Sequence, residues 1–485
     1  MNQISTALNT TAGDAAAGDA AQGATIARAL AGFAVGLEHD RVPAEARRRA
    51  VLLMLDAIGI AFACTRYDFA HRMLSGVASL DETPAGGGFP VIGMAARLPW
   101  RDALLMNAYL AHGLDFDDTH VEGVVHATAA AMPTALVTAA WRGRSGRDAV
   151  TAYIAAVETA VRVGAAAKGG FHQVGYHPTG LANTFGAALA AARLLDLTAE
   201  QAAHAQGIAL STASGSLEFL ADGAWTKRMH PGWAGMSGAT AAALARQGFQ
   251  GPALAYEGRF GLYNMLLQNA AAQCDLPRLT EGLGEVWEVA KVAVKPLPAC
   301  HFAHASADAA AILAKTHGLQ AADVARLELA VPDGVVKVIC EPEAQKRLPA
   351  SPYEAQFSVH YLAATAFLKG AVTLRDLEPE AIRDPAVLDL MGRTSYRVDP
   401  ASPFPKYFSG EAIVTTRDGR TLSHREEMNR GCADRPLSAD EIVEKFMANA
   451  TMTLSPARAA AVRDAVLDLD EPDLEAAEVL EMLAG

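Results

Sequence analysis

Apolar side chains recur at helical spacing through most of the first half of the chain. Residues 25–38 place them every three or four positions, which is the repeat of one face of an α-helix. A second helix is expected from Val42 to about Ala63, and its part 51–62 is apolar on nearly every side except at Asp56. A helix of this kind is typical of the centre of a helical core. The same pattern predicts further helices at residues 99–112, 126–141, 147–163, 181–194, 198–211, 234–247 and 438–483.

The pattern changes near residue 285. Residues 286–295 are rich in valine and partly alternating, which predicts a strand. The Asp418-Gly419 pair predicts the turn of a β-hairpin. We therefore expect a mainly α fold in three parts: helical at 24–285, α/β at 286–432, and helical at 433–485, with the last part packing on the first. Within the α/β part, the predicted strands are 324–331, 335–339, 411–416 and 421–425, and the predicted helices are 305–317, 357–368 and 384–391.

Composition narrows the class of protein. The 485 residues are 51% hydrophobic with a net charge of −13, which argues against a nucleic-acid or anionic-membrane partner. Five scattered cysteines without a Cys-x-x-Cys pair indicate a reduced, cytoplasmic chain. Residues 1–23 are mostly small and polar and lack an apolar signal-peptide core, so they are expected to form a disordered tail. No stretch has the roughly 20 consecutive apolar residues of a membrane span.

An acidic motif follows the predicted helix 99–112. Asp115, Asp117 and Asp118 lie within four positions, and such carboxylates repel one another unless cations or a metal face them. With His120 they could bind a hard divalent ion. The chain has neither a His-x-x-x-His pair on a helix nor an EF-hand loop, which disfavours a metal. It also lacks a Gly-x-Ser-x-Gly elbow and a dinucleotide-binding glycine loop.

Three other clusters carry chemistry at predicted helix ends or loops. His177 lies in a glycine-rich turn, Lys227 and Arg228 lie in a polar segment beside aromatic residues, and His301 and His304 follow a Lys-Pro-Leu-Pro run. Taken singly, each cluster is more often structural, as a satisfied histidine or a solvated turn. Together they fit one kind of chemistry, in which cations hold a small polycarboxylate and a histidine or aspartate moves a proton.

These clusters, in this order, resemble the MmgE/PrpD family. The resemblance covers about residues 25–470 and implies a homodimer with a helical domain from both chain ends, an inserted α/β lid, and a site between them without metal or cofactor. It carries catalytic or substrate-binding roles to six positions. The motifs that carry the resemblance are Ala111 to His120, Gly175 to Thr179, Thr226 to Gly232, Gly258 to Gly261, Lys295 to His304 and Ala355 to Ser358; the six positions are Asp115, Thr119, His126, His177, Lys227 and His304.

The resemblance implies a lyase acting on a small di- or tricarboxylate. A 2-methylcitrate-type dehydratase is the first expectation, and a cis-aconitate-type decarboxylase or an iminodisuccinate-type epimerase is the alternative. We expect Lys227 and His177 to hold substrate carboxylates, with Arg228 and His301 assisting, while Asp115 and His304 share the acid–base work. Asp117 and Asp118 are expected to orient helix ends and cations. A metal-dependent hydrolase and a non-catalytic binding protein are the rival classes.

Overall fold

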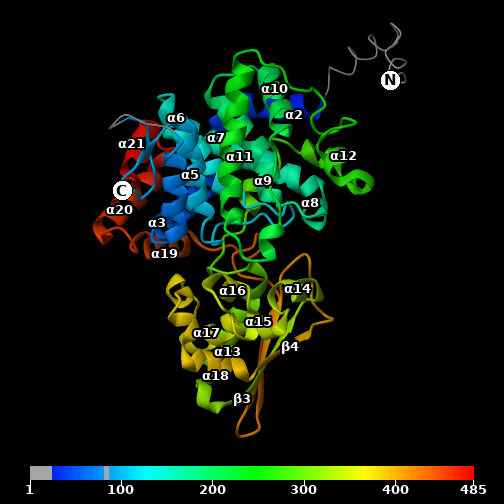
Figure 1. Ribbon diagram of the computed structural model, residues 1–485, viewed down its shortest axis with the longest axis vertical. Coiled ribbons are helices and arrows are strands. Elements are labelled where there is room, and N and C mark those ends of the chain that lie inside the picture. Colours follow the sequence, from blue (N-terminus) through cyan, green and yellow to red (C-terminus); the bar gives the residue numbers. More distant parts are fainter. Residues whose placement is uncertain (1–24, 81–86) are drawn as a thin grey trace, which may run out of the picture.

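Two groups of elements, each around its own hydrophobic core, make up the molecule (Figure 1). The structure is a computed structural model that describes residues 25–80 and 87–485. The predicted tail 1–23 and the start of a predicted loop at 81–86 lie outside the described residues. The fold is mainly α, as predicted. We call the two groups the larger lobe, drawn above in Figure 1, and the smaller lobe, drawn below.

The larger lobe is built around α9, which packs on both α7 and α11. Small residues allow this packing. A Cβ atom on Gly186 of α9 would lie 2.5 Å from the carbonyl oxygen of Ala156 on α7, so only glycine permits this approach. The helices of this lobe from the first part of the chain are α2 (Ile26–Gly36), α3 (Ala44–Cys64), α4 (Asp68–Ala78), α5 (Trp100–His112), α6 (Thr128–Trp141), α7 (Gly146–Ala166), α8 (Gly170–Gln173), α9 (Pro178–Leu194), α10 (Ala199–Leu210), α11 (Thr226–Arg246) and α12 (Leu262–Leu267).

The end of the chain returns to the larger lobe. Helix α19 (Ala439–Ala450) packs on α3, and α21 (Ala476–Met482) packs on α6, with α20 (Pro456–Leu467) between them in sequence. Lys445 of α19 forms a buried ion pair of 2.8 Å with Asp56 of α3. This pair gives the polar residue of the otherwise apolar helix α3 a partner. Both chain ends therefore share one core.

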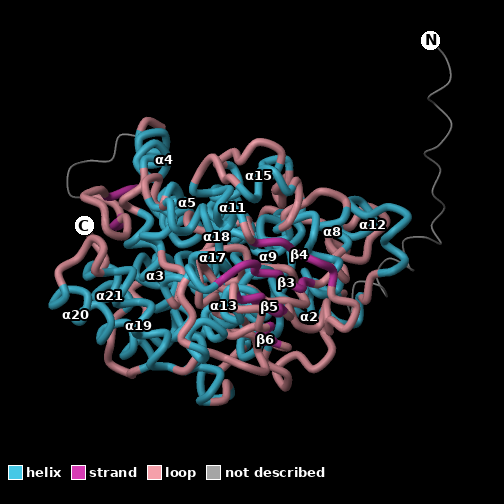
Figure 2. The backbone as a smooth tube through the Cα atoms, turned by 90° about the horizontal axis from the view of Figure 1, so that it is seen from below, coloured by secondary structure: helices cyan, strands magenta, loops and turns pink. Residues whose placement is uncertain are grey.

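The smaller lobe contains a four-stranded sheet of order β4-β3-β5-β6 (Figure 2). Strands β3 and β4 are parallel, and the other neighbours are antiparallel. Helix α13 packs on β5, β6 and α17. The exact boundaries predicted at 285 and 432 stay predictions. The elements are α13 (His304–His317), β3 (Val324–Val331), α14 (Val336–Ile339), α15 (Glu343–Arg347), α16 (Pro352–Gln356), α17 (Val359–Lys369), α18 (Pro385–Gly392), β4 (Thr394–Val398), β5 (Gly410–Thr416) and β6 (Thr421–Glu426).

Two predicted strands are wrong. Within 286–295 the structure has a 3-10 helix at Glu288–Lys291, and residues 292–295 are all buried instead of alternating between core and solvent. Residues 335–339 lie in a 3-10 turn and α14, with Val335 and Ile339 both buried. The sequence pattern does not predict strand β4. The strand at 324–331 and the hairpin of β5 and β6 are confirmed.

Two further expectations need correction in the larger lobe. The polar segment before residue 234 is not irregular: α11 already begins at Thr226 and contains Pro231. Close packing on α5 overrides the local pattern, since a Cβ on Gly232 would lie 2.4 Å from the Leu105 carbonyl oxygen. The lobe is also not entirely helical, because β1 (Phe89–Pro90) pairs with β2 (Arg97–Leu98).

Among the described residues, α7 is long and apolar enough to cross a membrane by length and composition. Its apolar window is completely buried inside the molecule, which is typical of a core helix.

Candidate active site

A cavity of about 770 Å³ lies between the two lobes. The larger lobe contributes its end of α5, the turn before α9 and the start of α11, and the smaller lobe contributes a wall rich in phenylalanine. Within the described part of the chain, five lysines and three carboxylates line the cavity, which favours a small anion. Its lining includes Asp115, Thr119, His120, Glu122, His126, Lys168, His172, His177, Phe219, Lys227, Lys291, Lys295, Cys300, His301, Phe302, Phe357, Phe404, Lys406, Tyr407, Phe408 and Asp434.

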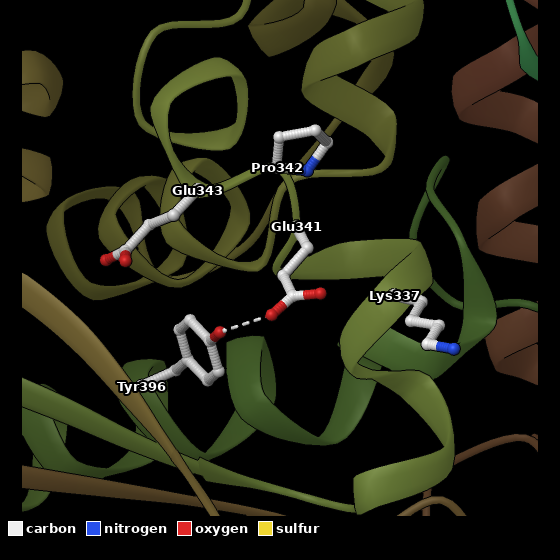
Figure 3. A pocket seen from close by; sticks show the side chains of 5 residues that line it. All are labelled: Lys337, Glu341, Pro342, Glu343 and Tyr396. Atoms are coloured by element: carbon white, nitrogen blue, oxygen red, sulfur yellow. Dashed lines mark hydrogen bonds between the residues drawn. The ribbon is translucent and has the colours of Figure 1, made fainter.

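A second pocket, of about 490 Å³, lies in the smaller lobe. Its lining includes Lys337, Glu341, Glu343 and Tyr396. The Tyr396 hydroxyl donates to Glu341 at 3.2 Å, while Lys337 and Glu343 point away from each other (Figure 3). The lining residues of this pocket do not converge on a common point. The chemistry suggested by the sequence lies in the larger cavity.

Asp115 is held at the cavity wall by two lysines. It follows α5 with φ of 52°, a left-handed conformation that aspartate adopts more readily than most residues. Its carboxylate lies 2.8 Å from Lys227 Nζ and 2.9 Å from Lys295 Nζ, and Lys295 also donates to the Asp115 carbonyl at 2.7 Å. Burial alone would raise the pKa of Asp115, but Lys227 and Lys295 hold it well below its usual range. The group is therefore an ionised carboxylate and a weak base.

His126 lies beside Asp115 with its orientation fixed from behind. Its Nδ1 lies 2.7 Å from the Asp118 carbonyl oxygen, which can only accept, so Nδ1 carries the proton of the neutral ring. The Thr119 hydroxyl lies 3.2 Å from the same nitrogen. Nε2 is left as a bare lone pair, 3.9 Å from the Asp115 carboxylate. Burial, together with Lys295 and Lys227, lowers the pKa of His126 to about 3.

More imidazoles stand behind and beside His126. His112 lies 2.8 Å from the buried carboxylate of Asp117 through its Nδ1, and its ring centre is 4.9 Å from that of His126. His177 is the residue before the first turn of α9, and its Nδ1 is hydrogen-bonded to His230 Nδ1 at 2.9 Å. Burial and Lys227 lower the pKa of His177 well below its ordinary value. The His126 and His177 rings are therefore uncharged at neutral pH.

Asp118 and Asp117 point away from the cavity and support it. Thr128, the first residue of α6, donates both its backbone N–H and its hydroxyl to Asp118. The Thr128 hydroxyl is also hydrogen-bonded to the buried Tyr153. Burial raises the pKa of Asp118 to about 7, whereas His112 and His126 outweigh burial and lower the pKa of Asp117 to about 2. Asp118 thus supports the start of α6, as the sequence predicted for a helix end, while Asp117 holds the His112 ring.

Two predicted site residues, His304 and Arg228, lie outside the cavity lining. His301 lines the cavity, but His304 does not: it is fully buried, with Nε2 donating to the Ala299 carbonyl at 3.1 Å. In this structure that hydrogen bond engages the Nε2 atom of His304. Arg228 also lies outside the lining: it donates to the Gly113 carbonyl at 2.8 Å and packs over Phe69, so it holds the turn after α5. The predicted residues that do meet at the cavity are Asp115, Thr119, His126, His177, Lys227 and His301.

Sequence reasoning missed Lys295 and His112 as site residues. Both lie within motifs quoted above, Lys295 at the start of the Lys-Pro-Leu-Pro run and His112 just before the acidic motif. A buried lysine needs an anionic partner, and the acidic motif lacked a second cation. This requirement was the signal in the sequence that could have paired Lys295 with the acidic motif.

The metal hypothesis from the sequence does not fit its original residues. His120 faces Glu288 at 3.2 Å and Asp118 faces Thr128, so neither converges with Asp115. Of the described residues, Asp115, Asp117 and His126 do bring ligand atoms within 4.8 Å of one another. Both oxygens of Asp115 already face lysine ammonium groups, which compete with an ion.

The fold and the site define a protein with a lysine-rich cavity, suited to a small anion, between a helical lobe and a smaller α/β lobe. Comparison with protein families makes the assignment specific: the MmgE/PrpD N-terminal domain matches residues 28–275 and the MmgE/PrpD C-terminal domain matches residues 297–471. The chain belongs to the MmgE/PrpD family.

Three curated relatives span nearly the whole chain. Cis-aconitate decarboxylase from Homo sapiens is 30% identical over 446 residues, which cover 89% of this chain and 88% of that protein. The enzyme of the same name from Mus musculus is 28% identical over 448 residues, with 89% and 88% covered. The one from Aspergillus terreus is 24% identical over 464 residues, with 90% and 92% covered.

Proposed function

We propose that this lyase decarboxylates a small unsaturated tricarboxylate, with cis-aconitate as the first candidate substrate. The observation that carries the proposal is that the groups at the reacting end of the cavity are weak bases. The pKa of Asp115 is well below its usual range and the pKa of His126 is about 3. The names of the relatives above support the same reaction.

The chemistry explains why weak bases favour this reaction. In a decarboxylation, the bond between a methylene carbon and its carboxylate breaks and carbon dioxide leaves. The electron pair shifts through the neighbouring double bond to the carbon beside a retained carboxylate, and that carbon takes one proton. Proton delivery is needed, but proton abstraction is not. A dehydratase must instead remove a proton next to a carboxylate, which calls for a stronger base.

The cations of the site are suited to the retained carboxylates. Lys227 and Lys295 face the cavity beside Asp115, and His177 stands at the start of α9, where the helix dipole also favours an anion. These preorganised positive groups stabilise charge that builds next to a carboxylate. The apolar wall with Phe357 and Phe408 leaves the departing carboxylate poorly solvated, which favours its loss as neutral carbon dioxide.

His126 is the proposed proton donor. Its bare Nε2 faces the cavity, and a bound trianion next to it favours the protonated ring. We therefore infer that the ring takes up a proton from solvent when substrate binds and then passes it to the new carbanion. Asp115 keeps the two lysines in position throughout.

Dehydration of 2-methylcitrate is the second candidate. The observation that favours it is the same bare Nε2 of His126, which would act as a base once substrate charge had raised its pKa.

A substrate panel separates these reactions. Purified protein is incubated with cis-aconitate, 2-methylcitrate, citrate and iminodisuccinate, and products are followed by ¹H NMR with carbon dioxide measured in parallel. We expect carbon dioxide and a methylene product from cis-aconitate only. Lys227→Met should lower this turnover by about 100-fold or more, whereas Lys315→Met, at an exposed lysine of α13, should not. Water loss from 2-methylcitrate without carbon dioxide would transfer the assignment to the second candidate.

The homodimer implied by the family resemblance is part of the proposal. Trp225, just before α11, and Trp233, within it, are exposed large apolar side chains that a second copy could cover. Analytical ultracentrifugation tests the homodimer, and a monomer in solution would contradict it.

A further inference from the structure

Three histidines converge at the back of the cavity. One ring nitrogen each of His112, His126 and His177 lies within 4.8 Å of the others. The rings come from three separate segments: the end of α5, the residues before α6, and the residue before α9. The decarboxylation proposed above uses His126 and His177 but assigns no role to His112.

Each of these rings is held through its Nδ1 by a second group. His112 Nδ1 contacts the Asp117 carboxylate at 2.8 Å, His126 Nδ1 donates to the Asp118 carbonyl at 2.7 Å, and His177 Nδ1 pairs with His230 at 2.9 Å. Histidines that bind metals are held in this way, with a carboxylate or carbonyl on one ring nitrogen and the ion on the other. These bonds leave the Nε2 atom of each ring unused by the three contacts.

The Nε2 of His112 has no hydrogen-bond partner among the described residues, although it is buried. The Nδ1 atom faces the Asp117 carboxylate, so Nε2 is the ring nitrogen left without a partner, and a buried polar atom without a partner is costly. This atom is the second observation that points to a ligand. A proton or a metal ion would satisfy it.

The local charge permits a cation. Lys227 and Lys295 bring two positive charges near the histidines, and the ionised Asp115 and Asp117 match them.

We propose that His112, His126 and His177 form a site for one divalent transition-metal ion, and that this ion inhibits the lyase. Imidazole nitrogen suits Zn²⁺, Co²⁺, Ni²⁺ and Cu²⁺, whereas Mg²⁺ and Ca²⁺ prefer oxygen. Since bonds from zinc to nitrogen are about 2.0–2.1 Å, each ring needs to shift by roughly 1 Å to close on an ion. The ion takes the Nε2 lone pair on which proton delivery by His126 depends. The inhibition therefore rests on the proposed function, whereas the binding does not.

Cobalt binding tests the site without relying on activity. Apo-protein is titrated with Co²⁺, and the visible absorption of the bound ion reports its geometry and stoichiometry. We expect one ion per chain. His112→Gln and His177→Gln should each weaken binding by about 10- to 100-fold or more, which is the size of effect seen even for outer-shell changes. His317→Gln, at an exposed histidine of α13, is the matched control and should bind like the wild type.

A second measurement covers variants that fail to fold. Anomalous diffraction from wild-type crystals soaked in Co²⁺ should place the ion between the three rings. An ion elsewhere, or unchanged affinity in both folded variants, would overturn the site. Zn²⁺ should also inhibit turnover of the active substrate, and a chelator should restore it. Full turnover with the ion bound between the rings would overturn the inhibition alone and leave the proposed lyase reaction standing.

Discussion

Asp115 and Asp118 are three residues apart, both buried, and opposite in behaviour. Asp115 faces two lysine ammonium groups, and its pKa lies well below the usual range. Asp118 faces a hydroxyl group and a backbone N–H, both from Thr128, and burial raises its pKa to about 7. Since both are buried aspartates, their partners decide the charge. One motif thus supplies both an ionised cavity wall and a group that supports the start of α6.

The largest effect is expected from removing the charge of Asp115. Asp115→Asn leaves Lys227 and Lys295 buried beside each other without their shared counter-ion. Unfolding free energy should fall by about 3–5 kcal/mol, as for other broken buried pairs, and turnover should fall with it. Urea denaturation measures the first effect and steady-state kinetics the second. An unchanged denaturation midpoint would show that the two lysines do not depend on Asp115.

The pH dependence of kcat/KM tests the role of His126, which lies beside Asp115 at the cavity. His126 must gain a proton before it can donate one, and in the free enzyme its pKa is about 3. Above that value the protonated fraction falls about tenfold per pH unit, so kcat/KM for the decarboxylation should fall as the pH rises from 6 to 8. A profile that is flat over this range contradicts proton delivery by His126. It would instead fit His126 acting as a base, because a ring with a pKa of about 3 is already unprotonated throughout this range.

The Asp118→Asn variant tests the raised pKa of Asp118. The folded pKa of about 7 is raised above the unfolded value of about 3.9, so the folded protein binds this proton more tightly. The stability that this proton contributes is present below about pH 4 and is lost as the pH rises through 7. Asparagine mimics the protonated group and removes that loss.

Thermodynamic stability measured at pH 5 and pH 8 checks this expectation. The unfolding free energy of Asp118→Asn minus that of the wild type should increase from pH 5 to pH 8, by up to about 3 kcal/mol. The Asp115→Asn variant is the matched control. The pKa of Asp115 in the folded protein is low, so the stability difference between this variant and the wild type should not change between pH 5 and pH 8. A difference between Asp118→Asn and the wild type that does not change with pH would contradict the raised pKa.

The smallest effect on activity is expected at Arg228. Its side chain lies outside the cavity lining and donates to the Gly113 carbonyl at 2.8 Å. Arg228→Met should reduce stability by about 1–3 kcal/mol, because that buried carbonyl loses its donor, while KM stays near the wild-type value. A large rise in KM with unchanged stability would instead give Arg228 the substrate contact predicted from the sequence.

Much of the fold followed from the spacing of apolar residues. Long helices such as α3 and α7 repeat that spacing over many turns, so local pattern and final structure agree. The strand predicted at residues 286–295 is wrong because exposed and buried positions do not alternate there: Val286 is exposed, Glu288 and Val289 are both buried, and residues 292–295 are all buried. The start of α11 failed because contact with α5 selects glycine at position 232, and glycine resembles a helix breaker in the sequence.

The residue types of the site could be predicted from the sequence, but the contacts between those residues could not. Asp115, His126, His177 and Lys227 do meet at the cavity. The left-handed backbone at Asp115 and the arrival of Lys295 from 180 positions away are tertiary facts without a local signal. His304 failed for a related reason: a short turn places His301 at the wall and leaves the histidine three residues later behind it.

The most direct test of the proposed decarboxylation is the fate of the proton in heavy water. The protein is incubated with cis-aconitate in D₂O, and carbon dioxide and product are followed together by NMR. We predict equal amounts of carbon dioxide and methylene product, with one deuterium per molecule on the carbon beside the retained carboxylate. Conversion without carbon dioxide, or activity confined to loss of water from 2-methylcitrate, would contradict the decarboxylation.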